Sequence, residues 1–284
     1  MERFSDLGLQ QWRHGWDLYR DLYAELYYGF EVQRIRHADE LRDALHTTAS
    51  RNLEIIDWGR IVDYRHSLSP LSVAGSVSTE GGRFNIGRRL DATSFTPFPA
   101  LYIGENYPTA YAEKYSIRDD EKRDGLTADE LVLRKPSSFN FVRVKGFLEL
   151  YVDIGNVETL SAVAKVIAKF KMPERVLKIA RSLKRAPPFK VASATALRTQ
   201  LLMKQWNTLP IHFDLPSNSQ IFGRLVNGAG FHGVLYPSAR TKLGRCLALY
   251  PQNWKGSKSF ISVADPAPKE ATLVHIDHDT AIFE

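Results

Sequence analysis

A glycine pair followed by an arginine, in residues 81–85 (Gly-Gly-Arg-Phe-Asn), is the part of this chain best suited to ligand chemistry. Glycines without a side chain let the backbone approach a ligand closely. Arg83 adds a planar, forked cation that matches phosphate oxygens. Residues 101–105 (Leu-Tyr-Ile-Gly-Glu) follow, and Glu113 comes shortly after them in a segment that should be helical. An arginine and a glutamate around such a turn could hold a dinucleotide diphosphate and stabilise a ribosyl cation.

The chemistry that fits these residues is cleavage of a nicotinamide dinucleotide at its glycosidic bond. This reaction develops positive charge on the ribose, which a nearby carboxylate stabilises. The diphosphate needs a clamp, and a bidentate arginine provides one. Arg60, Arg83 and Glu113 supply these groups if the fold brings them together. The alternative is that they are surface arginines and an exposed helical glutamate.

The composition is that of an ordinary soluble globular protein, with 284 residues, 44% of them hydrophobic and 25% charged. No apolar run approaches the roughly 18 residues of a membrane helix, and residues 1–6 lack a signal-peptide pattern. The single cysteine, Cys246, excludes an internal disulfide framework and fits a reducing compartment. We therefore expect a cytoplasmic protein with no membrane association.

The formal net charge of +6 is concentrated in residues 165–204, where Glu174 is the single acidic residue. One interpretation is a surface that binds nucleic acid or an acidic partner. The other is a set of solvated helix faces. We favour the second because no aromatic or motif signal accompanies the charge, and a nucleic-acid-binding module stays as an alternative.

Helical periodicity is clearest in residues 9–30, where aromatic side chains recur on one face. These are Trp12, Trp16, Tyr19, Tyr23 and Tyr27. The stripe is typical of core packing, although it could also dock a partner helix. Further helices are expected near 37–48, 110–116, 157–171, 173–185, 194–205 and 219–227. Strands are expected near 52–60, 99–103, 130–133, 139–144, 147–152, 233–236, 245–250, 259–263 and 271–276.

Residues 66–97 show little periodicity, and so long a loop within a domain usually has a function. The charged residues 118–130 are expected to be exposed. The element order predicts a mixed α+β fold that is mainly antiparallel.

Two further motifs favour structural readings. Residues 228–233 match Gly-x-Gly-x-x-Gly but follow a helix and precede a strand, the reverse of a dinucleotide fingerprint, so we expect a helix end and turn. His275, Asp277 and His278 could ligate a metal, but strand alternation separates neighbours. We expect no metal. Cys246 is expected to be a small core residue.

Five blocks in this order resemble the RES family, over roughly residues 55–250. They are Trp58-Gly-Arg60-Ile, Gly81-Gly-Arg83-Phe-Asn85, Phe98 to Glu105 with Ala110 to Glu113, Ser217 to Gly223, and Gly233 to Arg240. Members of that family are mostly toxins of bacterial toxin–antitoxin pairs with an Xre-type antitoxin. The family has an ADP-ribosyltransferase-like fold, and its members degrade NAD by hydrolysis or phosphorolysis, or transfer ADP-ribose to a protein.

The resemblance implies roles for individual residues. Arg60 matches the first family arginine, Arg83 the arginine after the glycines, and Glu113 the catalytic glutamate. Tyr102 matches the strand tyrosine. The implied NAD-binding residues are Gly82, Tyr102, Ser219, Gln220 and Ser238.

Some assignments stay open. Arg65 competes with Arg60 for the first arginine, and the family serine could be Ser238, Ser217 or Ser219. Typical family toxins are shorter, so residues 1–50, the basic segment and residues 251–284 are additions that put an antitoxin partner in question.

Together these observations predict one domain over residues 1–284, with an ADP-ribosyltransferase-like split antiparallel sheet and additional helices. NAD is the expected substrate, and nicotinamide is released to water or phosphate. Transfer of ADP-ribose to a protein is the nearest alternative. The oligomeric state is open.

Overall fold

The computed structural model describes residues 6–90, 93–115 and 138–280, with side chains from residue 13 onward. The helices are α1 (Asp6–Arg36), α2 (Ala38–Thr47), α3 (Tyr107–Tyr115), α5 (Ser161–Ala168), α6 (Glu174–Ser182), α7 (Ala194–Leu201), α8 (Thr208–Phe213) and α9 (Asn218–Gly228). The strands are β1 (Ser50–Asp63), β2 (Leu101–Gly104), β3 (Phe139–Asp153), β4 (Gly233–Pro237), β5 (Arg245–Leu249), β6 (Phe260–Val263) and β7 (His275–Ile276). Short 3-10 helices are η1 (Tyr64–His66), η2 (Ala74–Val77), η3 (Val157–Leu160) and η4 (Pro251–Asn253). The fold is mixed α+β, as predicted.

The strands form one sheet in the order β1-β2-β5-β4-β3-β6-β7, with an additional pairing of β1 and β3. That pairing closes β1, β2, β5, β4 and β3 into a ring. Among the described strands, β3 and β4 run parallel, and every other pair is antiparallel. The ring brings the end of β1 beside β2, where Gly59 pairs with Gly104.

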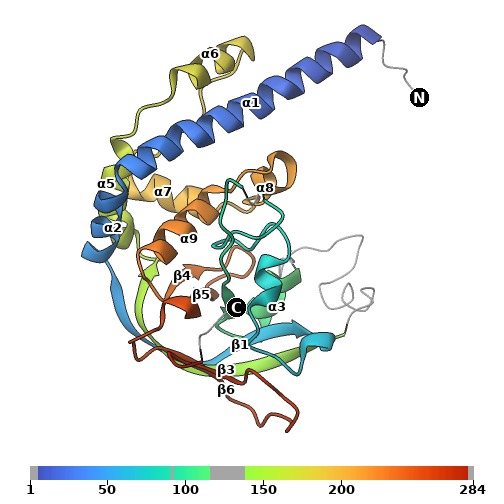
Figure 1. The fold of residues 1–284 in the computed structure, drawn as a ribbon, viewed down its shortest axis with the longest axis vertical. Helices are drawn as coiled ribbons and strands as arrows, with labels where there is room; N and C mark the ends of the chain where they lie inside the picture. Colours follow the sequence, from blue (N-terminus) through green and yellow to red (C-terminus); the bar gives the residue numbers. More distant parts are fainter. Residues whose placement is uncertain (1–5, 91–92, 116–137, 281–284) are drawn as a thin grey trace.

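Buried side chains form separate clusters on the two faces of the sheet. One cluster joins the sheet to the helices and includes Leu41, Phe84 and Phe222. The other, around Trp58 and Trp254, fills the opposite face. In Figure 1, α2, α5, α7 and α9 gather on one side of the strands, with the long α1 lying across them and α6 beside α1.

The predicted aromatic stripe of α1 packs within the chain. Trp16 and Tyr23 contact Phe213 at the end of α8, with ring centres 5.4 and 4.7 Å apart respectively. Tyr27 packs edge-on against Phe95 at 5.3 Å. The Trp12 side chain lies outside the described residues. These contacts favour core packing over docking of a partner helix.

Most predicted elements are present, although the strand expected at 271–276 is limited to β7 and the helix expected at 157–171 begins as η3 before α5. Residues 139–144 and 147–152 belong to one strand, because Gly146 continues the ladder and pairs with both Ile55 and Ile261. The short α8 was not predicted. It ends at Phe213, and the next residue, Asp214, has a left-handed backbone with φ of 53°. The expected strand at 130–133 and the exposed segment 118–130 lie outside the described residues.

The glycine motif at 228–233 is a helix end, as predicted. Helix α9 stops at Gly228, Gly230 has a positive φ of 80°, and β4 begins at Gly233. Within the described part of the chain, no helix is both long enough and apolar enough to cross a membrane.

Candidate functional site

Asn85 organises the glycine-rich loop from inside. Its side chain is fully buried and donates to the carbonyls of Ser76 and Phe98, at 2.9 and 3.0 Å. Its Oδ1 accepts from the Gly82 backbone N–H at 2.7 Å and from the Tyr102 hydroxyl at 2.9 Å. Both ends of the amide are therefore engaged, which ties the loop to the strand β2.

Gly82 lies directly against Tyr102. A Cβ atom added at Gly82 would come within 2.5 Å of the Tyr102 hydroxyl oxygen. The preceding Gly81 has φ of 96°, a backbone conformation in which a residue with a side chain would be strained. The glycine pair thus allows the backbone to close over the tyrosine.

Gly82→Ala is expected to destabilise the protein by about 1–3 kcal/mol, because the new methyl group overpacks the contact with Tyr102. Thermal unfolding of the two proteins measures the change. Gly75→Ala is the matched control, since nothing lies within 4 Å of its added Cβ in the same loop. Equal melting temperatures for the two variants would contradict the expectation.

A cavity of about 590 Å³ opens between this loop, the ring of strands and α3. Its lining includes Arg60 from β1, Gly82 and Arg83 from the loop, Tyr102 from β2 and Glu113 from α3. These residues are far apart in sequence, and the ring of strands brings them together. A smaller, apolar cavity of about 130 Å³ between α1, α7 and α9 is lined by none of the predicted site residues.

Arg83 is 5% exposed and has no carboxylate partner among the described residues. Its Nη1 donates to the carbonyls of Leu201 and Met203, at 3.3 and 2.9 Å, where α7 ends. The guanidinium carbon lies 5.8 Å from the ring centre of Trp206. These contacts fix the guanidinium without neutralising its charge.

Arg60 is a second cation without an acidic partner. Its Nη2 donates to the Ser72 carbonyl at 2.8 Å. Its Nη1 is buried and has no hydrogen-bond acceptor in the described part of the chain. Burial lowers the pKa of Arg60 to about 10, so the group is still charged at neutral pH. An uncompensated guanidinium on a cavity wall favours an anionic ligand there.

Glu113 is half-buried and held through one oxygen. Its Oε1 accepts from the Ser238 hydroxyl at 2.6 Å and from the Ala239 backbone N–H at 2.9 Å. Ser238 Oγ accepts in turn from the N–H groups of Arg240 and Thr241, which directs its own proton to Glu113. No hydrogen bond from a described residue reaches Oε2. The carboxylate is therefore oriented, with one oxygen available to a ligand.

Ser219 and Gln220 lie outside the cavity lining and are fully buried at the start of α9. The Gln220 amide donates to the carbonyls of Glu80 and Asn85, at 2.8 and 3.1 Å. Ser219 Oγ contacts Ser217 Oγ at 3.0 Å. The structure thus places Gln220 beneath the glycine-rich loop as a support, and both residues away from the ligand space.

The cavity carries an excess of positive charge. Arg65 and Arg240 also line it, and neither side chain has an acidic partner among the described residues. The nearby Lys114 pairs with Asp63 at 3.1 Å. Of the two carboxylates that line the cavity in the described ranges, Asp63 is paired with Lys114, and Glu113 has no cationic partner.

Tyr102 and Cys246 are neutral parts of the cavity wall. Burial raises the pKa of the Tyr102 hydroxyl above its usual value, although the Phe84 backbone N–H donates to it at 2.9 Å. Burial also raises the pKa of the Cys246 thiol, which is 2% exposed. A neutral thiol is a poor nucleophile, so the buried role expected for Cys246 fits its environment.

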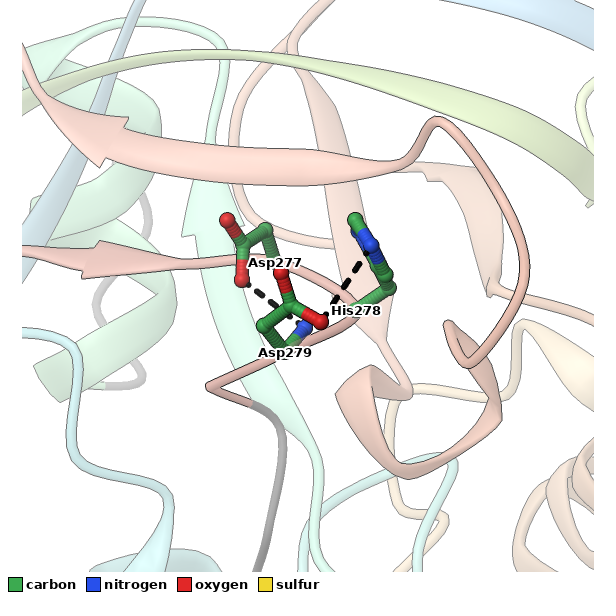
Figure 2. Close-up of side chains that lie close together, drawn as sticks. All are labelled: Asp277, His278 and Asp279. Atoms are coloured by element: carbon green, nitrogen blue, oxygen red, sulfur yellow. Dashed lines mark hydrogen bonds and ion pairs between the residues drawn. The ribbon is translucent and has the colours of Figure 1, made fainter.

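Acidic and histidine side chains gather in the turn after β7. Figure 2 shows Asp277, His278 and Asp279 close together there. The Asp277 carboxylate already accepts from His275 at 2.9 Å and from the backbone of Asp279 and Thr280 at 3.0 Å each. These bonds, led by His275, hold the pKa of Asp277 below its usual value. The three residues follow β7 instead of lying on it, so strand alternation does not separate their side chains as expected, and Asp277 is held in a hydrogen-bonded turn.

Several cations of the basic segment are engaged with the chain itself. Lys169 pairs with Glu40 at 2.9 Å, and Arg175 pairs with Glu25 at 3.1 Å. The Arg185 guanidinium lies 5.6 Å from the centre of the Tyr19 ring. The segment is spread over α5, α6 and α7.

Comparison with known proteins shows the family of the chain that carries this site. The sequence model of the RES domain matches residues 58–269, which include Arg60, Arg83, Glu113 and Ser238. The chain belongs to the RES domain family. No curated protein matches it. Among solved structures, it is similar to the M. tuberculosis MbcT–MbcA toxin–antitoxin complex, at 13% identity and a TM-score of 0.42, over 78% of this chain and 87% of that one.

In this RES domain, the cavity is also lined by residues that the motifs did not single out. Trp206 and Arg240 line the cavity. Arg240 could have been noticed as the last residue of the Pro-Ser-Ala-Arg block. Trp206 had no signal, because it lies in a helical connection with no motif. Arg60 and Arg65 both reach the cavity, the first from the strand wall and the second from the exposed η1.

Proposed function

We propose that this RES domain protein binds NAD in the cavity and breaks the bond between nicotinamide and its ribose. The observation that carries the proposal is that one cavity contains both arginines without acidic partners and one oriented carboxylate. A dinucleotide has a doubly charged diphosphate for the arginines. It also has a ribose that becomes cationic as nicotinamide leaves.

Each group has a distinct part in this scheme. Arg83 and Arg60 bind the diphosphate or the adjoining ribose, and Tyr102 borders the nicotinamide ribose. Glu113 contacts that ribose through Oε2 and stabilises its positive charge. The C1′–N bond breaks, and the nicotinamide nitrogen keeps the electron pair. An acceptor oxygen then bonds to C1′ and loses its proton to solvent.

The acceptor is water or phosphate, and transfer of ADP-ribose to a protein is the alternative. The wider family context makes a toxin the natural biological role, with an Xre-type antitoxin as the partner. The mainly antiparallel strands that form one wall of the cavity support an ADP-ribosyltransferase-like core. The scheme uses NAD as its substrate and assigns no step to a metal or to a further cofactor.

The test is NAD consumption by the purified chain, with and without phosphate, with products separated by chromatography. Nicotinamide and ADP-ribose would indicate hydrolysis, and a phosphorylated ADP-ribose would indicate phosphorolysis. Adenine-labelled NAD that leaves label on protein would identify transfer. Absence of both NAD binding and NAD loss would overturn the proposal, and the basic segment would become the next feature to test with nucleic acid.

Ser238→Ala is expected to lower the rate of nicotinamide release by about 10- to 100-fold, because the charged carboxylate of Glu113 loses a hydrogen bond. The Ala239 backbone N–H remains, so the loss should be smaller than for a change at Glu113 itself. Initial rates at saturating NAD measure it. Ser182→Ala on α6, whose hydroxyl contacts the Lys178 carbonyl, is the control. An unchanged rate would show that Ser238 does not position the carboxylate.

A further inference from the structure

Trp206 covers the face of Arg83 that points toward the connection between α7 and α8. The Arg83 guanidinium carbon lies 5.8 Å from the indole centre. Carbonyls of Leu201 and Met203 from the same connection hold the Arg83 Nη1. One short segment, residues 201–206, therefore supplies both the acceptors and the aromatic neighbour of this arginine.

The Trp206 indole also borders the cavity, in addition to its contact with Arg83. Trp206 is half-buried and lines the cavity. Aromatic side chains that combine a cavity-facing ring with a neighbouring arginine are suited to stack a nucleotide base, since every base has a π face. A tryptophan that served the core alone would be buried like Trp254, which is 0% exposed.

Trp206 and Glu113 reach the cavity from different elements. Trp206 precedes α8 in the chain, Glu113 lies on α3, and both residues line the cavity together with Arg83. Burial raises the pKa of the Cys246 thiol, Glu113 raises it further and Arg83 lowers it, so both charges lie near that thiol. Arg83 is therefore near Glu113 and is also a direct neighbour of Trp206.

We propose that Trp206 stacks on the adenine ring of the dinucleotide and favours ligands that carry a base at this end over ligands that lack one. The proposal rests on the function proposed above. With Glu113 at the nicotinamide ribose and Arg83 at the diphosphate, the next group along the substrate is the adenosine half. The ring beside Arg83 is then placed to receive its base.

The test compares ligands that contain different halves of NAD. Calorimetry measures the dissociation constants of NAD, ADP-ribose and nicotinamide mononucleotide in a Glu113→Gln background, which limits turnover. Trp206→Leu keeps an apolar side chain but loses the ring, and Trp206→Phe keeps a ring. Ile211→Ala on α8, which is 53% exposed and outside the cavity lining, is the control.

Trp206→Leu is expected to raise the dissociation constants of NAD and ADP-ribose by about 10- to 100-fold and to change that of nicotinamide mononucleotide by no more than about twofold. Trp206→Phe should recover most of the loss, and Ile211→Ala should change none of the three. Equal weakening of all three ligands would overturn the proposal, because it would mean that Trp206 acts only by holding Arg83. Selective weakening of nicotinamide mononucleotide would overturn it by placing the pyridine ring there.

Failure of this inference can be told apart from failure of the proposed function. If the protein carrying Trp206 binds NAD and Trp206→Leu binds it equally well, adenine stacking is wrong and NAD binding stands. If the protein carrying Trp206 binds none of the three ligands, both proposals fall together.

Discussion

Glu113→Gln is expected to slow NAD consumption by about 10²- to 10³-fold, which is the usual cost of removing one electrostatic contact to a transition state. Glutamine has nearly the size of glutamate, and its carbonyl can still accept from Ser238 and Ala239, which hold Oε1 in the native protein. The change therefore removes the charge and keeps the shape. Binding of NAD should weaken far less than the rate, because the ribosyl cation develops only as the bond breaks.

Rates of nicotinamide release and NAD dissociation constants measure the two effects separately. Glu270→Gln, on the exposed segment before β7, is the control for a lost carboxylate. Retention of full activity in Glu113→Gln would rule out the proposed mechanism. A loss of binding equal to the loss of rate would instead show that Glu113 holds the ground state.

Arg60→Met is expected to affect binding and stability in opposite directions. The guanidinium has no acidic partner, and one of its N–H groups is buried without an acceptor among the described residues. Loss of the guanidinium should raise the dissociation constant of NAD by about 10- to 100-fold, because a charge-assisted contact disappears. The same substitution removes a charge from a poorly solvated place, so the free energy of unfolding should not fall.

The size of the second effect follows from the pKa of Arg60, which burial lowers from the ordinary value of arginine to about 10. That shift corresponds to a destabilisation on the order of 3 kcal/mol at neutral pH. Loss of the hydrogen bond to the Ser72 carbonyl offsets part of the gain in Arg60→Met. The net change should therefore lie between zero and about 2 kcal/mol in favour of the variant.

The pH dependence has a definite sign. A base whose folded pKa is lowered destabilises the fold fully below that pKa, and the penalty disappears as pH rises through the window up to the unfolded value. For Arg60 this window begins at a pH of about 10 and ends at the ordinary pKa of arginine. The stability difference between the Arg60 protein and Arg60→Met should therefore be constant near neutrality and shrink above pH 10.

Chemical unfolding of both proteins across this range, with NAD binding measured at neutral pH, makes the comparison. Arg175→Met is the control, since Arg175 pairs with Glu25 and is largely exposed on α6. It should change neither quantity appreciably. A large fall in stability with unchanged NAD affinity would show that Arg60 is a structural residue.

Local patterns carried much of the fold. The helical face of α1, the helix that holds Glu113 and the strands β2, β4 and β5 all follow from short-range periodicity and turn residues. The pattern was weaker where long-range pairing decided the outcome. β3 continues through Gly146 because β1 and β6 pair on either side of it, and residues near in sequence do not reveal such partners.

The ordered blocks also predicted a set of residues that the fold brings together. Arg60, Gly82, Arg83, Tyr102 and Glu113 share one cavity, as their proposed roles require. The same reading could not separate ligand-facing residues from those beneath them. Gln220 sits in an equally specific block, yet its amide is buried under the glycine-rich loop. Burial depends on the packing of α9, which no motif records.

What the sequence determined by itself was the set of reactive groups and their local geometry. Glycines at 81 and 82 allow the tight loop, and the helix after β2 carries Glu113. The tertiary structure alone decided which groups meet. Ser238 reaches Glu113 across 125 residues, and Arg83 reaches the Leu201 carbonyl across 118. Such contacts form when the strand ring closes and the helices pack upon it. The entropy cost of bringing residues so far apart in sequence together is a property of the whole chain, so the local sequence around each residue does not reveal its partner.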